Sequence, residues 1–342
     1  MNFSKTLIAW YLQNKRSLPW RETTNPYFIW LSEIILQQTR VAQGKPYYEA
    51  FLQRFPTVQD LAFATEEEVL KLWQGLGYYS RARNLHATAK YIVTELQGKF
   101  PNTYTDLLSL KGVGEYTAAA IASFAYNESV AVVDGNVFRV LARIYGLESD
   151  IAKATTKKEF QKLAQELLPI DKAALFNQAI MEFGALQCVP KNPDCTICVF
   201  QSSCYAYQKK KVDEFPFKSK KIKISHRYFY YLVLRDAANH FVMLKREEKG
   251  IWHNLYEFTL LEYDQKPLLK EIVSRIQEQY PVKEIIVKNE KELLHKLSHQ
   301  HLHIHFIEVV LNTKIENAIS MERALQLPMP IVIHNFIASN YL

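Results

Sequence analysis

The chain has 342 residues, 48% of them hydrophobic, a length and composition that favour two folded domains over one. Lysine and arginine outnumber aspartate and glutamate by 42 to 35, and the net charge of +7 fits a polyanionic partner without requiring one. There is no run of about eighteen apolar residues, and the N-terminal segment soon reaches charges and Pro19, which excludes a membrane span and a secretory signal.

Residues 1–205 are predicted to form an all-helical domain. Apolar residues recur there at three- and four-residue steps, and strand-like runs are scarce. Thr65, followed by Glu68 three residues later, has the pattern of a capping box at the start of one helix. The clearest helical segments are 65–76, 82–96, 156–168 and 172–183.

The character of the sequence changes after residue 205. Residues 206–225 are rich in lysine, include Pro216 and hold few large apolar side chains, so they are predicted to form a basic linker. Residues 226–342 are rich in aromatic and β-branched side chains, which predicts a smaller α+β domain. The expected strands are 226–236, 240–247, 255–263 and 303–311, and the expected helix is 268–280.

All four cysteines lie close together, with the spacing C-x6-C-x2-C-x5-C. This is not the spread of a secreted disulfide framework, whereas four thiolates in one short loop can wrap a metal centre. Chemistry alone leaves a tetrahedral zinc site and an iron–sulfur cluster open. The predicted ligands are Cys188, Cys195, Cys198 and Cys204.

A Gly-x-Gly turn in the segment LKGVGEYTA, residues 110–118, lies between two helix-like stretches. Gly112 and Gly114 are expected to allow positive φ angles and a close approach of the backbone to a ligand. The free N–H groups at the start of the next helix would favour a phosphate there. Many turns of this kind are plain connectors, so the turn alone does not settle its role.

The cysteine spacing matches the four-iron–four-sulfur loop of the endonuclease III family of DNA repair glycosylases, and the turn resembles the helix-hairpin-helix motif of that family. Tyr116 stands where bifunctional members carry a lysine nucleophile, and a phenol cannot form a Schiff base. Segments 18–21, 26–39, 75–85 and 176–185 make the chain similar to the MutY-type adenine DNA glycosylases in particular.

This resemblance implies an all-α helix-hairpin-helix glycosylase domain with an iron–sulfur cluster loop, followed by a smaller α+β Nudix-like domain. It implies a monofunctional, cytoplasmic enzyme of base excision repair that excises adenine mispaired with 8-oxoguanine or guanine by hydrolysis, without strong lyase activity. The implied cofactor is one 4Fe–4S cluster, and the implied partner is double-stranded DNA with an A:8-oxoguanine or A:G mismatch, bound by a monomer away from membranes.

Two other interpretations stay open. A pyrimidine glycosylase with lyase activity is disfavoured by Tyr116 and by the extra C-terminal domain. A DNA-binding cluster protein without catalysis is disfavoured by two carboxylates, Glu33 and Asp134, that stand at the positions of the family's catalytic pair.

Glu33 lies within the segment WLSEIILQQTR, where most of its helical neighbours are apolar. Burial raises a carboxyl pKa, so we expect Glu33 to carry a proton near neutrality and to protonate N7 of the departing adenine. The alternative is a glutamate on the polar edge of a helix, paired with Arg40.

Asp134 follows the apolar run at 130–133 and precedes a helical pattern, so it is predicted to cap that helix. The helix dipole and N–H groups are expected to keep its pKa low. The resemblance makes Asp134 the anion that stabilises an oxocarbenium ion, and Asn136 the group that orients this carboxylate or the water. A simple helix cap is the alternative role of Asp134.

The resemblance supplies the other site residues. Tyr116 is expected near the reacting sugar, and Gln178 beside an edge of adenine. Gln38 and Tyr78 are expected to wedge into the duplex when the target base leaves the stack, although core packing is an alternative for Tyr78 and Tyr79. The remaining candidates are Trp20 and Arg21, which would close the pocket, and Thr39 beside the wedge.

The C-terminal domain resembles the Nudix-like domain of the same proteins, through residues 243–258. It has no Nudix box, so we expect it to recognise the oxidised partner base without pyrophosphohydrolase activity. The family's Phe-Ser-His loop reads Leu297-Ser298-His299 here, and Ser298 is expected to bond 8-oxoguanine, with His299 beside it. Alternate histidines from His299 to His305 form either a metal patch or a plain polar face.

Overall fold

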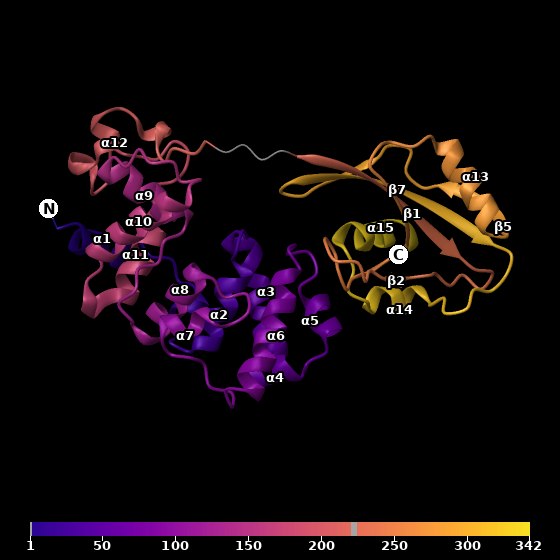
Figure 1. The fold of residues 1–342 in the computed structure, drawn as a ribbon, viewed down its shortest axis with the longest axis horizontal. Helices are drawn as coiled ribbons and strands as arrows, with labels where there is room; N and C mark the ends of the chain where they lie inside the picture. Colours follow the sequence, from indigo (N-terminus) through magenta and orange to yellow (C-terminus); the bar gives the residue numbers. More distant parts are fainter. Residues whose placement is uncertain (1, 220–223) are drawn as a thin grey trace. The chain divides into compact units, whose positions relative to one another are not determined.

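The computed structural model describes residues 2–219 and 224–342. The chain divides into two compact units (Figure 1): Met1–Phe63 with Asn84–Lys220, called the helical unit, and Ala64–Arg83 with Lys221–Leu342, called the sheet unit. In the described part of the chain, no helix combines the length and the hydropathy that crossing a membrane requires.

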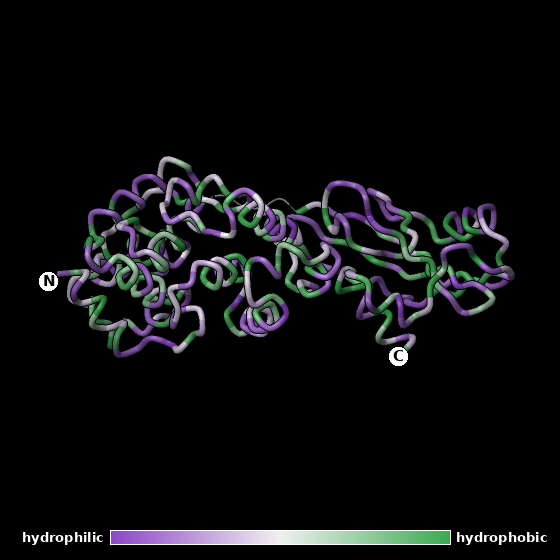
Figure 2. Tube along the Cα trace, turned by 90° about the horizontal axis from the view of Figure 1, so that it is seen from below, coloured by the Kyte–Doolittle hydropathy of each residue, from purple (hydrophilic) through white to green (hydrophobic). Residues whose placement is uncertain are grey.

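Several helices of the helical unit bury one face, and others are buried on most sides. Hydrophobic and hydrophilic residues alternate within their turns (Figure 2), as expected for amphipathic helices. The segments predicted at 82–96, 156–168 and 172–183 are confirmed as α6 (Ser80–Thr94), α10 (Ala154–Leu167) and α11 (Ala173–Leu186). Further helices are α1 (Phe3–Asn14), η1 (Pro19–Arg21), α2 (Pro26–Ile35), α3 (Val41–Arg54), α4 (Val58–Phe63), α7 (Tyr104–Leu108), α8 (Glu115–Tyr126), α9 (Gly135–Tyr145), η2 (Ile170–Lys172) and η3 (Gln201–Ser203).

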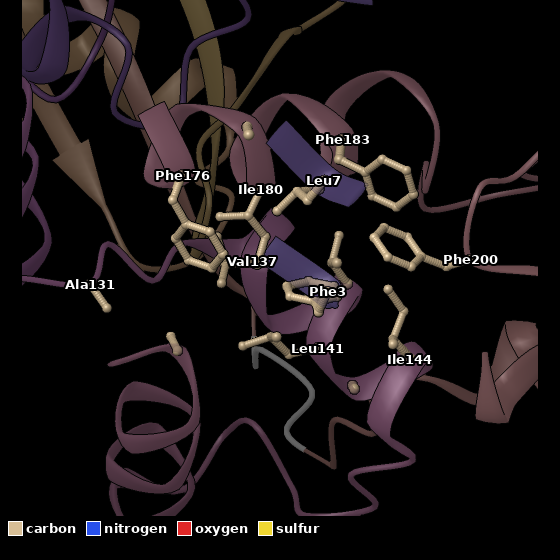
Figure 3. Close-up of a cluster of buried hydrophobic side chains, with 14 of the residues drawn as sticks. Phe3, Leu7, Ala131, Val137, Leu141, Ile144, Phe176, Ile180, Phe183 and Phe200 are labelled. Carbon is tan, nitrogen blue, oxygen red and sulfur yellow. The ribbon is translucent and has the colours of Figure 1, made fainter. Parts of the chain in front are cut away.

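One hydrophobic core of the helical unit joins α1, α9 and α11 (Figure 3). Phe3 lies 6.3 Å from Phe176, ring centre to ring centre, and Trp10 lies 4.9 Å from Phe183. Phe183 also packs edge-on against Phe200, at 5.3 Å, which brings the cysteine-bearing loop into the same core. This packing fixes the start of α9 and one face of α11, and both carry candidate site residues.

Much of the predicted linker at 206–225 packs onto the helical unit instead. The segment holds α12 (Tyr205–Gln208) and η4 (Val212–Glu214), and the Phe215 side chain is buried in the core. The buried Arg143 guanidinium donates to the carbonyls of Val212 and Phe215, at 3.0 and 3.2 Å. A few apolar side chains within the basic stretch therefore suffice to dock it, while 220–223 lie outside the described residues.

The sheet unit is built around two long parallel strands, β1 (Ser225–Arg235) and β7 (Gln300–Leu311). The strand order is β4-β1-β7-β5, and β6 also pairs with β7. The predicted strands 226–236 and 303–311 and the predicted helix are confirmed. The predicted strand 255–263 is divided into two short strands that belong to different sheets, and 240–247 contains only a short strand. The remaining elements are β2 (Leu244–Lys245), β3 (Tyr256–Glu257), β4 (Thr259–Tyr263), α13 (Leu269–Gln279), β5 (Val282–Val287), β6 (Leu293–Lys296), α14 (Met321–Gln326) and α15 (Ile331–Tyr341).

Helices cover both faces of this sheet. Ile272 and Ile276 of α13 join the core on one face. Phe336 of α15 stacks on Phe306 on the other face, with the ring centres 3.8 Å apart. The second core thus lies on β1 and β7, whose residues alternate between the two helices.

The helix α5 (Glu66–Leu72) belongs to the sheet unit, although it precedes the predicted domain boundary. Its capping box is confirmed, since Thr65 and Glu68 bond each other through side chain and backbone. The Lys71 ammonium donates to the carbonyl of Leu325 at 2.6 Å, and Glu67 accepts from the Tyr256 hydroxyl at 2.6 Å. These tertiary contacts explain a boundary that local sequence pattern does not reveal.

Candidate active site

Two cavities of the helical unit meet at Glu33, Tyr116 and Asp134. The smaller cavity has a volume of about 530 Å³ and is also lined by Trp20 and Gln178. The larger groove, of about 1240 Å³, runs past the start of α8 and along α10. A side chain at the meeting point can therefore act on a group in either space.

Glu33 is buried on α2, with only 7% of its surface exposed. The Tyr116 hydroxyl donates a hydrogen bond of 2.8 Å to Glu33 Oε2. Burial raises the pKa of Glu33 to about 7, while the hydrogen bond from Tyr116 lowers it and the nearby Asp134 raises it further. Glu33 is thus a carboxyl group that is substantially protonated at neutral pH. The structure does not pair it with Arg40.

Tyr116 is the second residue of α8, directly after the Gly-x-Gly turn. Burial, together with the charges of Glu33 and Asp134, raises the pKa of its hydroxyl well above the ordinary value. The phenol therefore stays neutral and serves as a hydrogen-bond donor to Glu33.

Asp134 caps α9, as its sequence context predicts. Oδ1 accepts from the Val137 N–H at 2.8 Å, and Oδ2 accepts from the Asn136 amide at 2.8 Å. The expected lowering of its pKa is wrong in direction: burial raises the pKa of Asp134, and the hydrogen bonds from Val137 and Asn136 only oppose that rise. The loss of water around the carboxyl group raises its pKa by more than the N–H groups at the start of α9 lower it.

Arg139 connects this carboxylate to the cysteine-bearing loop, a role that sequence reasoning missed. Its guanidinium donates to Asn136 Oδ1 at 2.8 Å and to the carbonyls of Gly184 and Cys188 at 2.7 and 2.8 Å. The local signal was an arginine three residues after Asn136 on one helix face. A continuous chain of hydrogen bonds thus runs from Asp134 to Cys188.

Two further residues were also missed: Glu182, which lines the smaller cavity, and Tyr11, which bonds Gln178 of that cavity. Glu182 is fully buried on α11 and accepts from Arg16 and Arg21, with the shortest contacts at 2.6 and 2.8 Å. Burial alone raises the pKa of Glu182, but the hydrogen bonds from these two arginines lower it to about 2. Tyr11 donates at 2.6 Å to Gln178 Oε1, which leaves the Gln178 amide N–H₂ available to a ligand.

Only one of the two glycines in the Gly-x-Gly turn has the expected positive φ angle. Gly112 has a φ of +79°, and a Cβ there would meet the Asn84 side chain at 2.7 Å. Gly114 caps α8 with a φ of −92°, so the expected positive φ at this position is wrong. A Cβ on Gly114 would meet no atom within 4 Å, and the start of α8 is therefore open to a ligand.

Gln38 and Thr39 lie after the end of α2, where the chain turns. Gln38 adopts a φ of +56° and lines the larger groove, while Thr39 lines the smaller cavity. A positive φ on a residue that is not glycine is strained, which points to a constrained position for Gln38.

The remaining DNA-binding candidates lie in the sheet unit. The hydroxyl of Tyr78 is in hydrogen-bond contact with that of Ser298, at the tip of the β6–β7 hairpin. Tyr78 is 42% exposed and has a φ of +48°, whereas its neighbour Tyr79 is buried in the core. His299 is exposed in the hairpin turn and does not belong to β7, so the expected strand of alternate histidines begins two residues later.

His303, in the row of alternate histidines, is held by hydrogen bonds to residues outside that row. His303 bonds His226 through Nε2 at 2.8 Å and Glu292 through Nδ1 at 2.8 Å. Over residues 2–219 and 224–342, no three histidine, cysteine, aspartate or glutamate side chains are arranged to hold a metal ion. The histidines therefore form a polar face.

The four cysteines line one small cavity beside α9 and α11. Their thiols form no disulfide. The Arg143 guanidinium donates to Cys188 Sγ and the Phe200 N–H to Cys198 Sγ, both at 3.5 Å. Thiolate sulfur is the ligand type of iron–sulfur and zinc centres, and N–H donors lie 3.5 Å from two of these sulfurs. The four sulfurs line one space but, as placed, do not form a group that holds a metal ion.

The chain matches two known families, one in its N-terminal part and one in its C-terminal part. Residues 31–167 match the family of HhH-GPD superfamily base excision DNA repair proteins, and residues 230–339 match the NUDIX domain. The helical match contains Glu33, Tyr116 and Asp134.

The chain is similar to proteins named adenine DNA glycosylase and to a solved DNA glycosylase structure. The chain is 38% identical over 312 residues to the adenine DNA glycosylase of Buchnera aphidicola subsp. Baizongia pistaciae, covering 91% of this chain and 86% of that protein. It is 47% identical over 216 residues to the adenine DNA glycosylase of Rattus norvegicus, covering 60% and 42%. Among solved structures, a thermostable thymine-DNA glycosylase superposes with a TM-score of 0.56 at 30% identity, covering 60% of this chain and 95% of that one.

The buried Glu182 predicts a stability that depends on pH. Its folded-state pKa of about 2 lies below the ordinary value, so the charge pairing is fully present above about pH 4.3 and is lost as the pH falls toward 2. A shift of this size corresponds to about 3 kcal/mol. We expect Glu182→Gln to lower the free energy of unfolding by about 3 kcal/mol at pH 7 and by about half as much at pH 3, as measured by urea denaturation.

A matched control is Glu49→Gln, which removes an exposed pair with Lys45 at 3.7 Å. Because exposed pairs stabilise weakly, its loss should stay below about 1 kcal/mol at both pH values. The account is contradicted if Glu182→Gln costs as much at pH 3 as at pH 7.

Proposed function

Because the chain belongs to the family of adenine DNA glycosylases, we propose that it removes adenine mispaired with 8-oxoguanine or guanine and leaves an abasic site. The observation that carries the proposal is the pair of carboxyl groups at the junction of the two cavities, one buried and protonated near neutrality, the other held by N–H donors. Such a pair supplies an acid and an anion for breaking an N-glycosidic bond.

Glu33 is the acid in this proposal. Tyr116 donates to Oε2, so the proton of Glu33 resides on Oε1 and is free to pass to N7 of adenine. With N7 protonated, the bond from N9 to the sugar breaks, and its electron pair leaves with the base. A pKa of about 7 keeps a large fraction of Glu33 in the acid form at neutral pH.

Asp134 is the anion that faces the developing charge on the sugar. Val137 and Asn136 hold its two oxygens, and Arg139 in turn holds Asn136. A carboxylate fixed in place stabilises an oxocarbenium ion without reorganising during the reaction. Water then adds to the sugar carbon and loses a proton to the ionised Glu33, which restores the acid and completes the hydrolysis. Tyr116, which cannot form a Schiff base, supports a monofunctional enzyme without strong lyase activity.

Recognition of the partner base is assigned to the sheet unit. The contact between the Tyr78 and Ser298 hydroxyls joins an exposed aromatic ring to a polar hairpin tip, and His299 lies next to it. Such a surface can stack on a base and hydrogen-bond its edge. Leu297 offers no aromatic ring, so the stacking is assigned to Tyr78. Gln38 is proposed to enter the duplex from the helical unit, and the enzyme is proposed to act as a monomer.

We propose that Cys188, Cys195, Cys198 and Cys204 hold one 4Fe–4S cluster. The cluster would cross-link the loop that packs on Phe183 through Phe200. Because Arg139 and Arg143 both bond groups of this loop, the loop supports α9 and the capped Asp134.

The activity is tested by single-turnover base release from duplexes with adenine opposite 8-oxoguanine, guanine or thymine, each treated with mild alkali. We expect adenine release from the first two only, strand breaks only after alkali, and no strong borohydride-trapped adduct. Glu33→Gln should slow release by about 10²–10⁴-fold and Asp134→Asn by about 10²–10³-fold, with binding retained. Breaks without alkali would mean a lyase. Release at the wild-type rate from Glu33→Gln would refute the acid role.

The cofactor is tested by metal and sulfide analysis of the purified protein together with its visible absorption. We expect about four irons and four sulfides per chain and a broad thiolate–iron band. Cys198→Ser should lose iron and lower the melting temperature, while Ser202→Ala in the same loop should keep both. One zinc per chain without sulfide would contradict the proposal.

A further inference from the structure

One wall of the larger groove is a single face of α10. That face presents Lys157, Lys158 and Lys162 together with Gln161 and Gln165. All five residues are exposed, and none of the groove-lining residues of α10 is acidic. Lys162 also meets Glu166 at 3.9 Å, but both side chains are strongly exposed, so this pair competes only weakly with a ligand.

The charges in the groove are unevenly distributed. Glu33 and Asp134 lie where it meets the smaller cavity, and the open start of α8 at Gly114 lines it as well. A DNA strand whose sugar lies at Asp134 must place its phosphates away from the two carboxyl groups. The N–H groups of α8 offer one electropositive position, although the exposed Glu115 of the same turn also lines the groove, and the lysines of α10 offer another.

The spacing of the lysines suits a nucleic-acid backbone. Lys157 and Lys158 precede Lys162 by five and four residues, which is about 6–7.5 Å along a helix axis. The rise of about 3.4 Å per nucleotide makes this close to the rise of two nucleotides along a duplex axis.

The lysine face is also fixed in register with Asp134. The Gln161 amide donates to the Ala131 carbonyl at 2.8 Å, and Gln165 accepts from the Ala131 N–H at 2.8 Å. From the other side, Asn177 of α11 accepts from the Val132 N–H at 3.0 Å. The segment leading into Asp134 is therefore held between two helices, and a phosphate bound on α10 has a defined position relative to the catalytic carboxylate.

From these observations we infer that the lysine face of α10 is a second phosphate-binding wall, which grips the strand carrying the target adenine and sets its sugar in register with Asp134. This inference rests on the proposed function and adds to it a binding surface. Lys157, Lys158 and Lys162 contact phosphates, and Gln161 and Gln165 are positioning residues that act through Ala131.

The test compares the full-length chain with the triple variant Lys157→Ala, Lys158→Ala, Lys162→Ala. Binding is measured from 0.05 to 0.3 M salt on a duplex with 2′-fluoro-2′-deoxyadenosine opposite 8-oxoguanine, which resists cleavage. Each lost phosphate contact lowers the slope of log affinity against log salt by about 0.9, so we expect a slope smaller by about 2–3 and at least about tenfold weaker binding at 0.1 M salt. The matching arginine variant should restore both.

The control is Lys5→Ala, Lys90→Ala, Lys172→Ala, which makes the same change in net charge at exposed positions outside the groove. If the two triple variants show equal slopes of log affinity against log salt, the lysines of α10 do not bind phosphates. This conclusion would hold even if the wild type releases adenine normally. If the wild type releases no adenine but the slopes differ as expected, the proposed function fails while the phosphate contacts stand. The wild type could instead form a borohydride-trapped adduct with an abasic duplex that the α10 variant does not form. In that case a lysine of α10 would be an amine nucleophile, and the assignment of these lysines to phosphates would be wrong.

Discussion

A carboxyl group kept out of water is the constraint on which the rest of this site depends. Glu33 holds a proton near neutrality because burial on α2 raises its pKa by more than the hydrogen bond from Tyr116 lowers it. Burial of a carboxyl group costs stability, and the surrounding core offsets that cost. The packing of α1, α9 and α11 also fixes Asp134 opposite the buried acid. The two carboxyl groups thus differ in environment, and that difference separates an acid from an anion.

The cysteine-bearing loop also helps to hold Asp134 in place. Asp134 is bonded by Asn136, Asn136 by Arg139, and Arg139 reaches the carbonyl of Cys188. Arg143, one turn along α9, donates to carbonyls on both sides of the loop. A loop more than fifty residues away in sequence therefore supports the helix that Asp134 caps, and this explains how a bound cluster can matter without taking part in the chemistry.

The sequence predicts features that depend on neighbouring residues and does not reveal features that depend on tertiary contacts. Periodicity found α10 and α11, and a cap pattern placed Asp134, because these signals lie within a few residues. Glu182 carries no such signal, since its partners Arg16 and Arg21 are more than a hundred residues away. Strand β5 was missed because Lys283 and Glu284 interrupt its apolar pattern. The pKa direction of Asp134 was missed because desolvation depends on the closed site.

The most direct test of the account is the pH dependence of adenine release at saturating enzyme. Because only the protonated form of Glu33 acts, the rate should be highest below about pH 7 and fall as the pH rises through that value. The hydrogen bond from Tyr116 lowers the pKa of Glu33, so Tyr116→Phe should move the fall to higher pH. A rate that stays constant from pH 6 to about 8.5, or the same fall in Glu33→Gln, would contradict a buried glutamic acid as the source of the proton.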